Sequence, residues 1–310
     1  MSSKTANQTV TPGYSSPGMW QFLGPFAEIG EKLKRVFVHT QLDIVGMGVA
    51  GTVTTMLILS LALNPAPLVV GLIAFSVYVG DRISDVKREP SSTAERSEFV
   101  KEHKKILSVA SALAYGIAVA ISLTGGPLSL AVTLIPGTAW IVYASDVVDT
   151  ADLPMSRLKD RLLVNSSLVA FAWTVAMVLL PLSFVNHSVT PLALVLAVYF
   201  FLDIFINTEI PNVRDVNEDE KNGVATIPTT VGIPKTRSIL YVLNLLLVGL
   251  LVLSGVSEIV PFVFVGILVG SRALSLLLNY GVGRVQIYRG LEMAGEMNHV
   301  LVLFLVLFLT

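Results

Sequence analysis

The sequence contains no cysteine, which excludes disulfide bonds, thiol catalysis and metal sites with cysteine ligands. Charged residues are also scarce, at 14% of 310 residues, against about 25% in a typical globular protein. Hydrophobic residues make up 53%, and the mean hydropathy is +0.73. This composition argues against a protein that binds nucleic acid through a basic surface. This composition leaves too little polar surface for a soluble protein and predicts an integral membrane protein.

Apolar stretches long enough to cross a membrane, at about 20 residues each, recur along the chain. We predict an all-α, polytopic bundle of nine transmembrane helices, at 42–63, 66–85, 105–124, 127–145, 161–184, 189–208, 238–254, 257–279 and 293–310. Pro136 and Gly137 interrupt the fourth span. Arg272 lies within the eighth span, so we expect the apolar core of that span to end before this residue.

The first 40 residues differ from the rest in composition. Residues 1–17 carry Ser, Thr, Asn, Gln, Gly and Pro, which is typical of disordered segments. Residues 19–38 mix apolar and charged side chains, which fits either an amphipathic segment at the membrane surface or a solvated connector. We therefore predict an N-terminal segment over 1–40 and a transmembrane domain over 41–310.

The positions of the 21 lysine and arginine residues test the span count, because cytoplasmic loops carry an excess of these residues. All of them fall before the first span or near the connections between spans two and three, four and five, six and seven, and eight and nine. The other connections carry none. We therefore predict a cytoplasmic N-terminus, cytoplasmic basic loops and a C-terminus on the outside.

Two acidic pairs with the same spacing end the second and sixth predicted spans. The first pair is Asp81 and Asp85, and the second is Asp215 and Asp219. Residues four apart lie on one face of a helix, so two aspartates there repel each other unless a cation lies beside them. Mg²⁺ prefers such hard oxygen ligands and binds phosphates through one or two carboxylates. A single pair of this kind is more often a solvated helix end. Each pair here also opens a predicted loop of about 20–30 residues, a length typical of functional or disordered segments.

The two pairs are offset by 134 residues, with four predicted spans between them, so both emerge on the same side of the membrane. We interpret the offset as an internal duplication with halves 41–160 and 161–310. Four carboxylates at one mouth of a bundle need more than one divalent ion or a strongly basic surrounding. A diphosphate on a lipid tail fits this chemistry, because metal ions neutralise the leaving group and Lys or Arg binds the remaining oxygens.

These motifs resemble those of the UbiA superfamily of intramembrane prenyltransferases, nine-helix proteins with aspartate-rich motifs after the second and sixth spans. In this sequence, the first family motif is matched by Asp81-Arg82-x-x-Asp85-x-Lys87-Arg88. The second is matched by Val213-Arg214-Asp215-x-x-x-Asp219, followed by Gly223, Thr226-Ile-Pro228 and Val231-Gly232. The chain departs from the family pattern at Val77, where the first motif usually has Asn, and at Pro211.

The resemblance implies Mg²⁺-dependent transfer of a polyprenyl group from an allylic prenyl diphosphate to a lipophilic acceptor, either an aromatic or quinone precursor or an isoprenoid lipid. It implies that four aspartates act in catalysis and hold two Mg²⁺ ions: Asp81, Asp85, Asp215 and Asp219. The candidates for substrate binding are Arg82, Arg88, Arg214, Lys221, Lys87, Lys159 and Asp203. Asp203 lies within a span, so it either binds substrate or pairs with a neighbouring helix. The active site is expected to face the cytoplasm.

Two other functions stay open. A membrane transporter is consistent with Asp203 and the interrupted fourth span. A catalytically inactive relative of the family is consistent with Val77 and Pro211.

Three smaller patterns complete the predictions. Gly46, Gly48 and Gly51 favour close packing of the first span against its neighbours. Asp43 is expected at the membrane interface, and the four histidines show no metal-ligand spacing. Six aromatic residues are candidates for lining a prenyl cavity: Tyr78, Trp140, Tyr143, Trp173, Tyr199 and Phe200.

Overall fold

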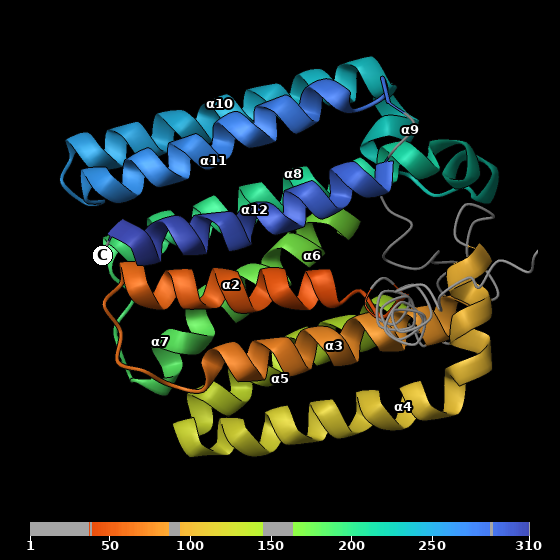
Figure 1. Ribbon diagram of the computed structural model, residues 1–310, viewed down its shortest axis with the longest axis horizontal. Coiled ribbons are helices and arrows are strands. Elements are labelled where there is room, and N and C mark those ends of the chain that lie inside the picture. The colour runs from red at the N-terminus through yellow and green to blue at the C-terminus, as the bar shows by residue number, and fades with distance from the viewer. Residues whose placement is uncertain (1–36, 38, 87–93, 145–163, 286–287, 310) are drawn as a thin grey trace, which may run out of the picture. The chain divides into compact units, whose positions relative to one another are not determined.

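The computed structural model describes residues 37, 39–86, 94–144, 164–285 and 288–309, and every regular element in this part is helical. The main helices are α2 (Leu42–Ile58), α3 (Ala66–Asp85), α4 (Ala94–Ser122), α5 (Pro127–Ala144), α6 (Val164–Thr174), α7 (Leu180–Phe184), α8 (Pro191–Asn222), α9 (Ile227–Val231), α10 (Ile233–Val256), α11 (Phe262–Gly281) and α12 (Tyr288–Leu309). A 3₁₀ turn, η2 (Leu123–Gly125), precedes α5, and a π-helical segment, η5 (Val175–Leu179), joins α6 to α7. Figure 1 shows the long helices lying side by side.

Seven helical segments in the described ranges are long and apolar enough to cross a membrane. They are Ala66–Ser84, Arg96–Gly125, Ser166–Phe184, Pro191–Asn222, Ile233–Val256, Phe262–Gly281 and Tyr288–Leu309. Two shorter apolar helices, Leu42–Ile58 and Pro127–Thr138, lie where the first and fourth spans are predicted. The all-helical class is therefore confirmed, while the count of nine spans and the orientation of the termini stay predictions.

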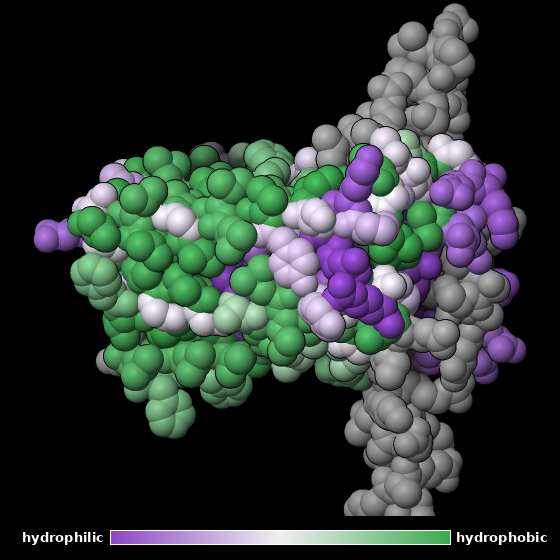
Figure 2. All heavy atoms as spheres, turned by 90° about the horizontal axis from the view of Figure 1, so that it is seen from above, coloured by the Kyte–Doolittle hydropathy of each residue, from purple (hydrophilic) through white to green (hydrophobic). Residues whose placement is uncertain are grey.

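The surface of the helices fits a lipid environment. Figure 2 shows apolar residues over most of one face and hydrophilic residues gathered mainly toward one end. Large apolar side chains such as Ile117, Leu246 and Phe304 are exposed. Apolar patches of this extent are rare on soluble monomers and mark surfaces that contact a membrane or a partner.

Helix α8 is longer than its predicted span and continues through Pro211 to Asn222. Gly223 ends it in the left-handed conformation, with a φ of 71°, and the N–H of Val224 donates to the carbonyl of Asp219 at 2.9 Å. The second acidic pair thus lies on the last turns of a continuous helix. Only residues 223–226 separate α8 from α9, so the predicted long loop after the sixth span is wrong.

Arg272 lies in the middle of α11 and is 0% exposed, so the expectation that the apolar core ends before it is wrong. Its Nη1 lies 2.5 Å from Oδ1 of Asp203 on α8. The Nε2 of His299 on α12 lies 2.9 Å from the other carboxylate oxygen of Asp203. The physical reason is pairing. A buried charge that has lost its partner destabilises a protein far more than a buried charge that is paired with an opposite charge.

Neutral groups extend this ion pair into a network between three helices. The Nη2 of Arg272 donates to the Tyr199 hydroxyl at 3.2 Å and to Ser271 Oγ at 2.9 Å. The Nδ2 of Asn298 donates to the same Ser271 oxygen at 2.9 Å. Helices α8, α11 and α12 are therefore joined at one level by bonds that an apolar surrounding makes costly to break.

Two glycines let α2 pack closely on the segment that contains α6 and η5. A Cβ on Gly48 would lie 2.4 Å from Cζ3 of Trp173, and a Cβ on Gly51 would lie 2.6 Å from Sδ of Met177. A Cβ on Gly46 would have no atom within 4 Å. The predicted role in close packing is confirmed for Gly48 and Gly51 and is wrong for Gly46, which faces open space.

Replacing these glycines is expected to have opposite effects on stability. Gly48→Ala should lower the free energy of unfolding by about 1–3 kcal/mol, because Trp173 has to move to admit the methyl group. Gly46→Ala should be neutral or stabilising by up to about 1 kcal/mol, because Ala favours helix over Gly. Thermal unfolding of both variants in detergent measures the difference, and equal melting temperatures would contradict the packing.

Breaking the central ion pair is expected to destabilise the bundle strongly. Asp203→Asn or Arg272→Met should each lower stability by about 3–5 kcal/mol, since each leaves a buried charge without its partner. Asp203→Asn combined with Arg272→Met should recover part of the loss. Arg284→Met is the matched control, because Arg284 is exposed and stacks on Tyr280. Melting temperatures that fall additively in the double variant would show that the two residues do not act as a pair.

Candidate functional site

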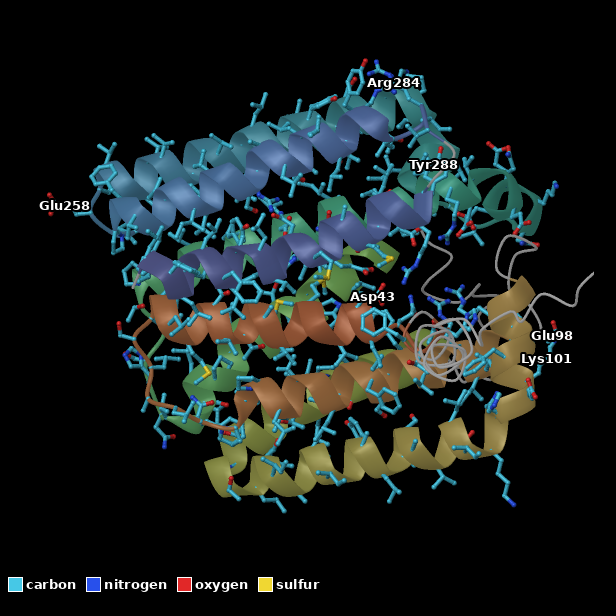
Figure 3. The ribbon with its side chains drawn as sticks, in the orientation of Figure 1. Asp43, Glu98, Lys101, Glu258, Arg284 and Tyr288 are labelled. Atoms are coloured by element: carbon cyan, nitrogen blue, oxygen red, sulfur yellow. The ribbon has the colours of Figure 1, made fainter. Side chains whose placement is uncertain are left out.

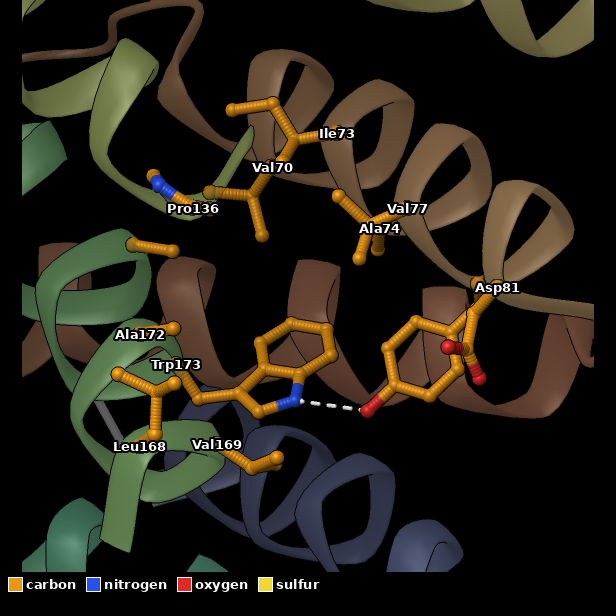
Figure 4. A pocket seen from close by; sticks show the side chains of 12 residues that line it. Val70, Ile73, Ala74, Val77, Asp81, Pro136, Leu168, Val169, Ala172 and Trp173 are labelled. Carbon is orange, nitrogen blue, oxygen red and sulfur yellow. Dashed lines mark hydrogen bonds between the residues drawn. The ribbon is translucent and has the colours of Figure 1, made fainter. Parts of the chain in front are cut away.

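An apolar cavity lies between α3, α5 and the α6–η5 segment and contains about 750 Å³ of empty space, counted out to its open mouth. Figure 4 shows Asp81 at one end of the cavity and Val70 and Pro136 toward the other. The remaining lining residues are Ile73, Ala74, Val77, Tyr78, Leu168, Val169, Ala172, Trp173 and Ala176. A carboxylate at the end of an otherwise apolar chamber suits a ligand with a polar head and a hydrocarbon tail.

Two prolines interrupt the backbone hydrogen bonding of the segments that border this cavity. Pro136 lies inside α5 and lines the cavity, and it has no N–H to donate to the carbonyl of residue 132. The π-helical segment η5 ends just before Pro181, which likewise has no N–H for the carbonyl of residue 177. Such local widening of a helix is frequent at functional sites.

Two aromatic residues form one wall of the cavity close to Asp81. Trp173 Nε1 donates a hydrogen bond of 3.1 Å to the Tyr78 hydroxyl, and the ring centroids are 6.1 Å apart. Of the other predicted aromatic liners, Tyr199 and Phe200 do not line this cavity and are buried in the core. The side chains of Trp140 and Tyr143 lie outside the described part of the chain.

The second acidic motif carries its own cation. Arg214 Nε donates to Asp215 Oδ1 at 2.7 Å, and Nη2 donates to Oδ2 at 2.6 Å, so the guanidinium takes both carboxylate oxygens. The third nitrogen, Nη1, donates to Glu292 Oε1 of α12 at 2.5 Å. The carboxylate of Asp215 is therefore already bound to a cationic group, the guanidinium of Arg214.

Helix α12 and the start of α2 add charged groups that the two motifs do not contain. Arg289 pairs with Asp43 of α2, and its Nη1 lies 3.3 Å from Glu292 Oε2 and 3.9 Å from Glu296 Oε1. Asp43 is 2% exposed. Sequence reasoning missed Arg289, Glu292 and Glu296 as site residues. The signal was present, because Glu292 and Glu296 repeat the four-residue spacing of the two aspartate pairs.

The charged groups of both motifs gather at one end of the helices. Figure 3 shows Asp43 and Tyr288, from the starts of α2 and α12, far from Glu258 at the opposite end. Glu296, Arg82 and Asp81 all interact electrostatically with Tyr78. Arg82 bonds to Gln41 just before α2, and Arg289 joins Asp43 of α2 to Glu292, which in turn pairs with Arg214.

The other predicted site residues fall into three groups. Arg82 lies on α3 and donates from Nε to Gln41 Oε1 at 2.9 Å, and Lys221 is exposed on the last turn of α8. Asp203 does not line the Asp81 cavity and lies in the buried network with Arg272 and His299. The side chain of Asp85 and all of Lys87, Arg88 and Lys159 lie outside the described part of the chain.

The carboxylates at this end of the molecule suit a divalent cation that also binds a ligand. Among the described side chains, no three His, Asp or Glu residues converge closely enough to hold a metal ion. Mg²⁺ usually binds through one or two carboxylates and completes its shell with water and substrate phosphates. Asp81 and Asp215 supply carboxylates of this kind, so the donor set fits Mg²⁺ together with a phosphate-bearing substrate.

Several solved structures share this fold. A structure of digeranylgeranylglyceryl phosphate synthase has a TM-score of 0.58 and 15% identity and covers 90% of this chain and 96% of its own. A UbiA homologue from Archaeoglobus fulgidus bound to GPP and Mg²⁺ has a TM-score of 0.66 and 13% identity, covering 89% and 98%. A UbiA homologue from Aeropyrum pernix K1 has a TM-score of 0.62 and 14% identity, covering 86% and 98%. At these identities the likeness establishes the fold.

No curated protein matches the chain by sequence. The model of the UbiA prenyltransferase family matches residues 81–283, a range that begins at the first aspartate of the first motif and includes all of the second. The match covers more than half of the chain and agrees with the fold, and the chain therefore belongs to the UbiA prenyltransferase family.

Proposed function

We propose that this protein transfers a prenyl group from an allylic prenyl diphosphate to a lipophilic acceptor within the membrane, in a reaction that requires Mg²⁺. The observation that carries the proposal is the apolar cavity that has Asp81 at its end. The tail of the donor would lie among Val70, Ile73 and Ala176, and its diphosphate would lie beside Asp81. The one-sided distribution of basic residues supports an active site that faces the cytoplasm.

The chemistry of the mouth supports a diphosphate ligand. Asp81 and Asp215 would hold Mg²⁺, with Asp85 and Asp219 one helical turn away, and two ions would share the four carboxylates. Bound Mg²⁺ supplies charge neutralisation on the diphosphate oxygens. Relatives of the same fold have been solved with GPP and Mg²⁺ and with DMAPP and Mg²⁺, which supports the same classes of ligand here.

The residues of the chain account for the remaining needs of the reaction. Diphosphate leaves with the electrons of its bond to the allylic carbon, and the acceptor forms the new bond and loses a proton. The faces of Tyr78 and Trp173 would stabilise the cationic carbon next to the mouth. The apolar walls would exclude water, which otherwise captures the cation.

The depth of the cavity indicates the length of the donor. Along α3 the lining extends from Asp81 to Val70, a rise of about 16 Å. An isoprene unit adds four carbon–carbon bonds of about 1.5 Å each, or about 5 Å when extended. The cavity therefore has room for about three units.

Replacing either first aspartate should abolish transfer. We expect Asp81→Asn and Asp215→Asn each to lower the rate by at least about 100-fold. Each change removes a negative charge that would hold the Mg²⁺ ions, which neutralise the leaving diphosphate. Release of diphosphate from radiolabelled farnesyl diphosphate by purified protein with Mg²⁺ measures the effect. Glu220→Gln, an exposed change near the end of α8, should retain full activity.

Wild-type rates in both asparagine variants would reject the proposed site. The transporter alternative makes the opposite prediction, namely substrate flux into liposomes that survives both changes. An inactive relative would neither bind nor release diphosphate for donors of any tail length.

The space in the cavity should set the preferred tail length. Ala176→Phe places a bulky side chain in the lining and is expected to shift the preference toward donors about one unit shorter. Affinities of non-hydrolysable analogues with one to eight isoprene units measure the shift. Ala112→Phe, on the exposed face of α4, is the matched control and should change nothing. An unchanged preference in Ala176→Phe would contradict a tail bound in this cavity.

A further inference from the structure

We infer that Glu292 is a positioning residue, which holds Arg214 when a divalent cation takes the carboxylate of Asp215. The inference rests on the proposed function, since it concerns the same diphosphate site. It assigns a role to a residue outside both aspartate motifs.

Arg214 and a divalent cation compete for one carboxylate. Arg214 donates from Nε and Nη2 to the two oxygens of Asp215, at 2.7 and 2.6 Å. A two-pronged pair of this kind is among the stronger hydrogen-bonded contacts in proteins. A divalent cation needs the same oxygens, and the guanidinium and the metal ion repel each other. Metal binding at Asp215 is therefore opposed by Arg214 and favoured when Arg214 moves away from this carboxylate.

Arg214 needs another partner when it is released. Its side chain is only 21% exposed, so water can hydrate the free guanidinium only in part. The second partner is already in contact, because Nη1 donates to Glu292 Oε1 at 2.5 Å. A small rotation would move Arg214 from shared binding to binding by Glu292 alone.

Glu292 is itself fixed in place. Its side chain is 9% exposed, and its other oxygen, Oε2, accepts from Arg289 Nη1 at 3.3 Å. Arg289 in turn pairs with Asp43 on α2. With an arginine on each oxygen, Glu292 is placed to receive Arg214 rather than to bind the metal ion directly.

This exchange makes metal and diphosphate binding cooperative. A divalent cation alone has to displace Arg214 from Asp215. A diphosphate offers Arg214 anionic oxygens in exchange, so each ligand lowers the cost of binding the other. The protein should therefore bind divalent cations weakly until a diphosphate arrives.

Mn²⁺ binding followed by electron paramagnetic resonance tests the inference without any turnover. In the absence of diphosphate, Arg214→Gln should bind Mn²⁺ about tenfold more tightly than the wild type, because the competitor is gone. Arg214→Lys, which keeps the charge but loses the two-pronged bond, should be intermediate. Glu292→Gln should bind Mn²⁺ more weakly, because Arg214 then has only Asp215 as a charged partner.

The double variant Arg214→Gln/Glu292→Gln separates positioning from direct coordination. If Glu292 acts through Arg214, the double variant should match Arg214→Gln. A double variant that binds Mn²⁺ more weakly than Arg214→Gln would overturn the inference, because Glu292 would then be a ligand. Glu220→Gln is the exposed control and should match the wild type.

Failure of the inference and failure of the proposed function give different results. Wild-type binding that Asp215→Asn abolishes, together with no gain in Arg214→Gln, would overturn the inference alone. No Mn²⁺ binding by the wild type or any variant, even with inorganic diphosphate present, would overturn both. Both are supported if inorganic diphosphate strengthens Mn²⁺ binding by the wild type and strengthens it less in Arg214→Gln.

Discussion

A charge inside an apolar bundle has to meet an opposite charge, and the arrangement of the helices depends on how Asp203 meets this constraint. Its two oxygens are shared between Arg272 of α11 and His299 of α12. Helix α8 also carries Asp215, about three turns further along. The buried pair therefore fixes the rotation of α8 about its axis, and with it the direction in which the second motif points.

The two halves of the proposed donor site use different physical properties. The tail cavity is lined by apolar and small side chains, with Pro136 of α5 among them. The mouth depends on alternating charge, with arginines between carboxylates of α2, α8 and α12. Asp81 belongs to both, since it lines the cavity and lies among the charges that surround Tyr78.

Sequence reasoning predicted the local patterns and missed what depends on the relative placement of helices. The spacing of Asp81 and Asp85, and of Asp215 and Asp219, identified the two motifs because residues four apart share a helix face. Glu292 and Glu296 have the same spacing, but nothing in the sequence indicates that α12 lies beside α8. Arg272 seemed to end a span because its partner lies 69 residues earlier in the chain.

The predicted end of the sixth span shows a different limit of pattern reading. Pro211 interrupts the apolar pattern, yet α8 continues for another eleven residues after it. Proline removes one hydrogen bond from a helix, but it fixes a backbone angle that helices share, so packing on both sides can carry the helix through it. Ile210 and Val213, on either side of Pro211, are both buried against Val282.

The length of α8 has a consequence for how the donor is chosen. Its 32 residues rise about 48 Å, whereas the hydrocarbon layer of a bilayer is about 30 Å thick and covers about 20 residues. If α8 crosses the layer from its first residue, Pro211 stands at the boundary and Asp215 and Asp219 stand among the phospholipid headgroups. Every neighbouring lipid then presents a phosphate at the depth of Arg214. Attraction to phosphate alone does not distinguish the proposed donor from these lipids, so its selection would have to come from the tail cavity and from the divalent cations together.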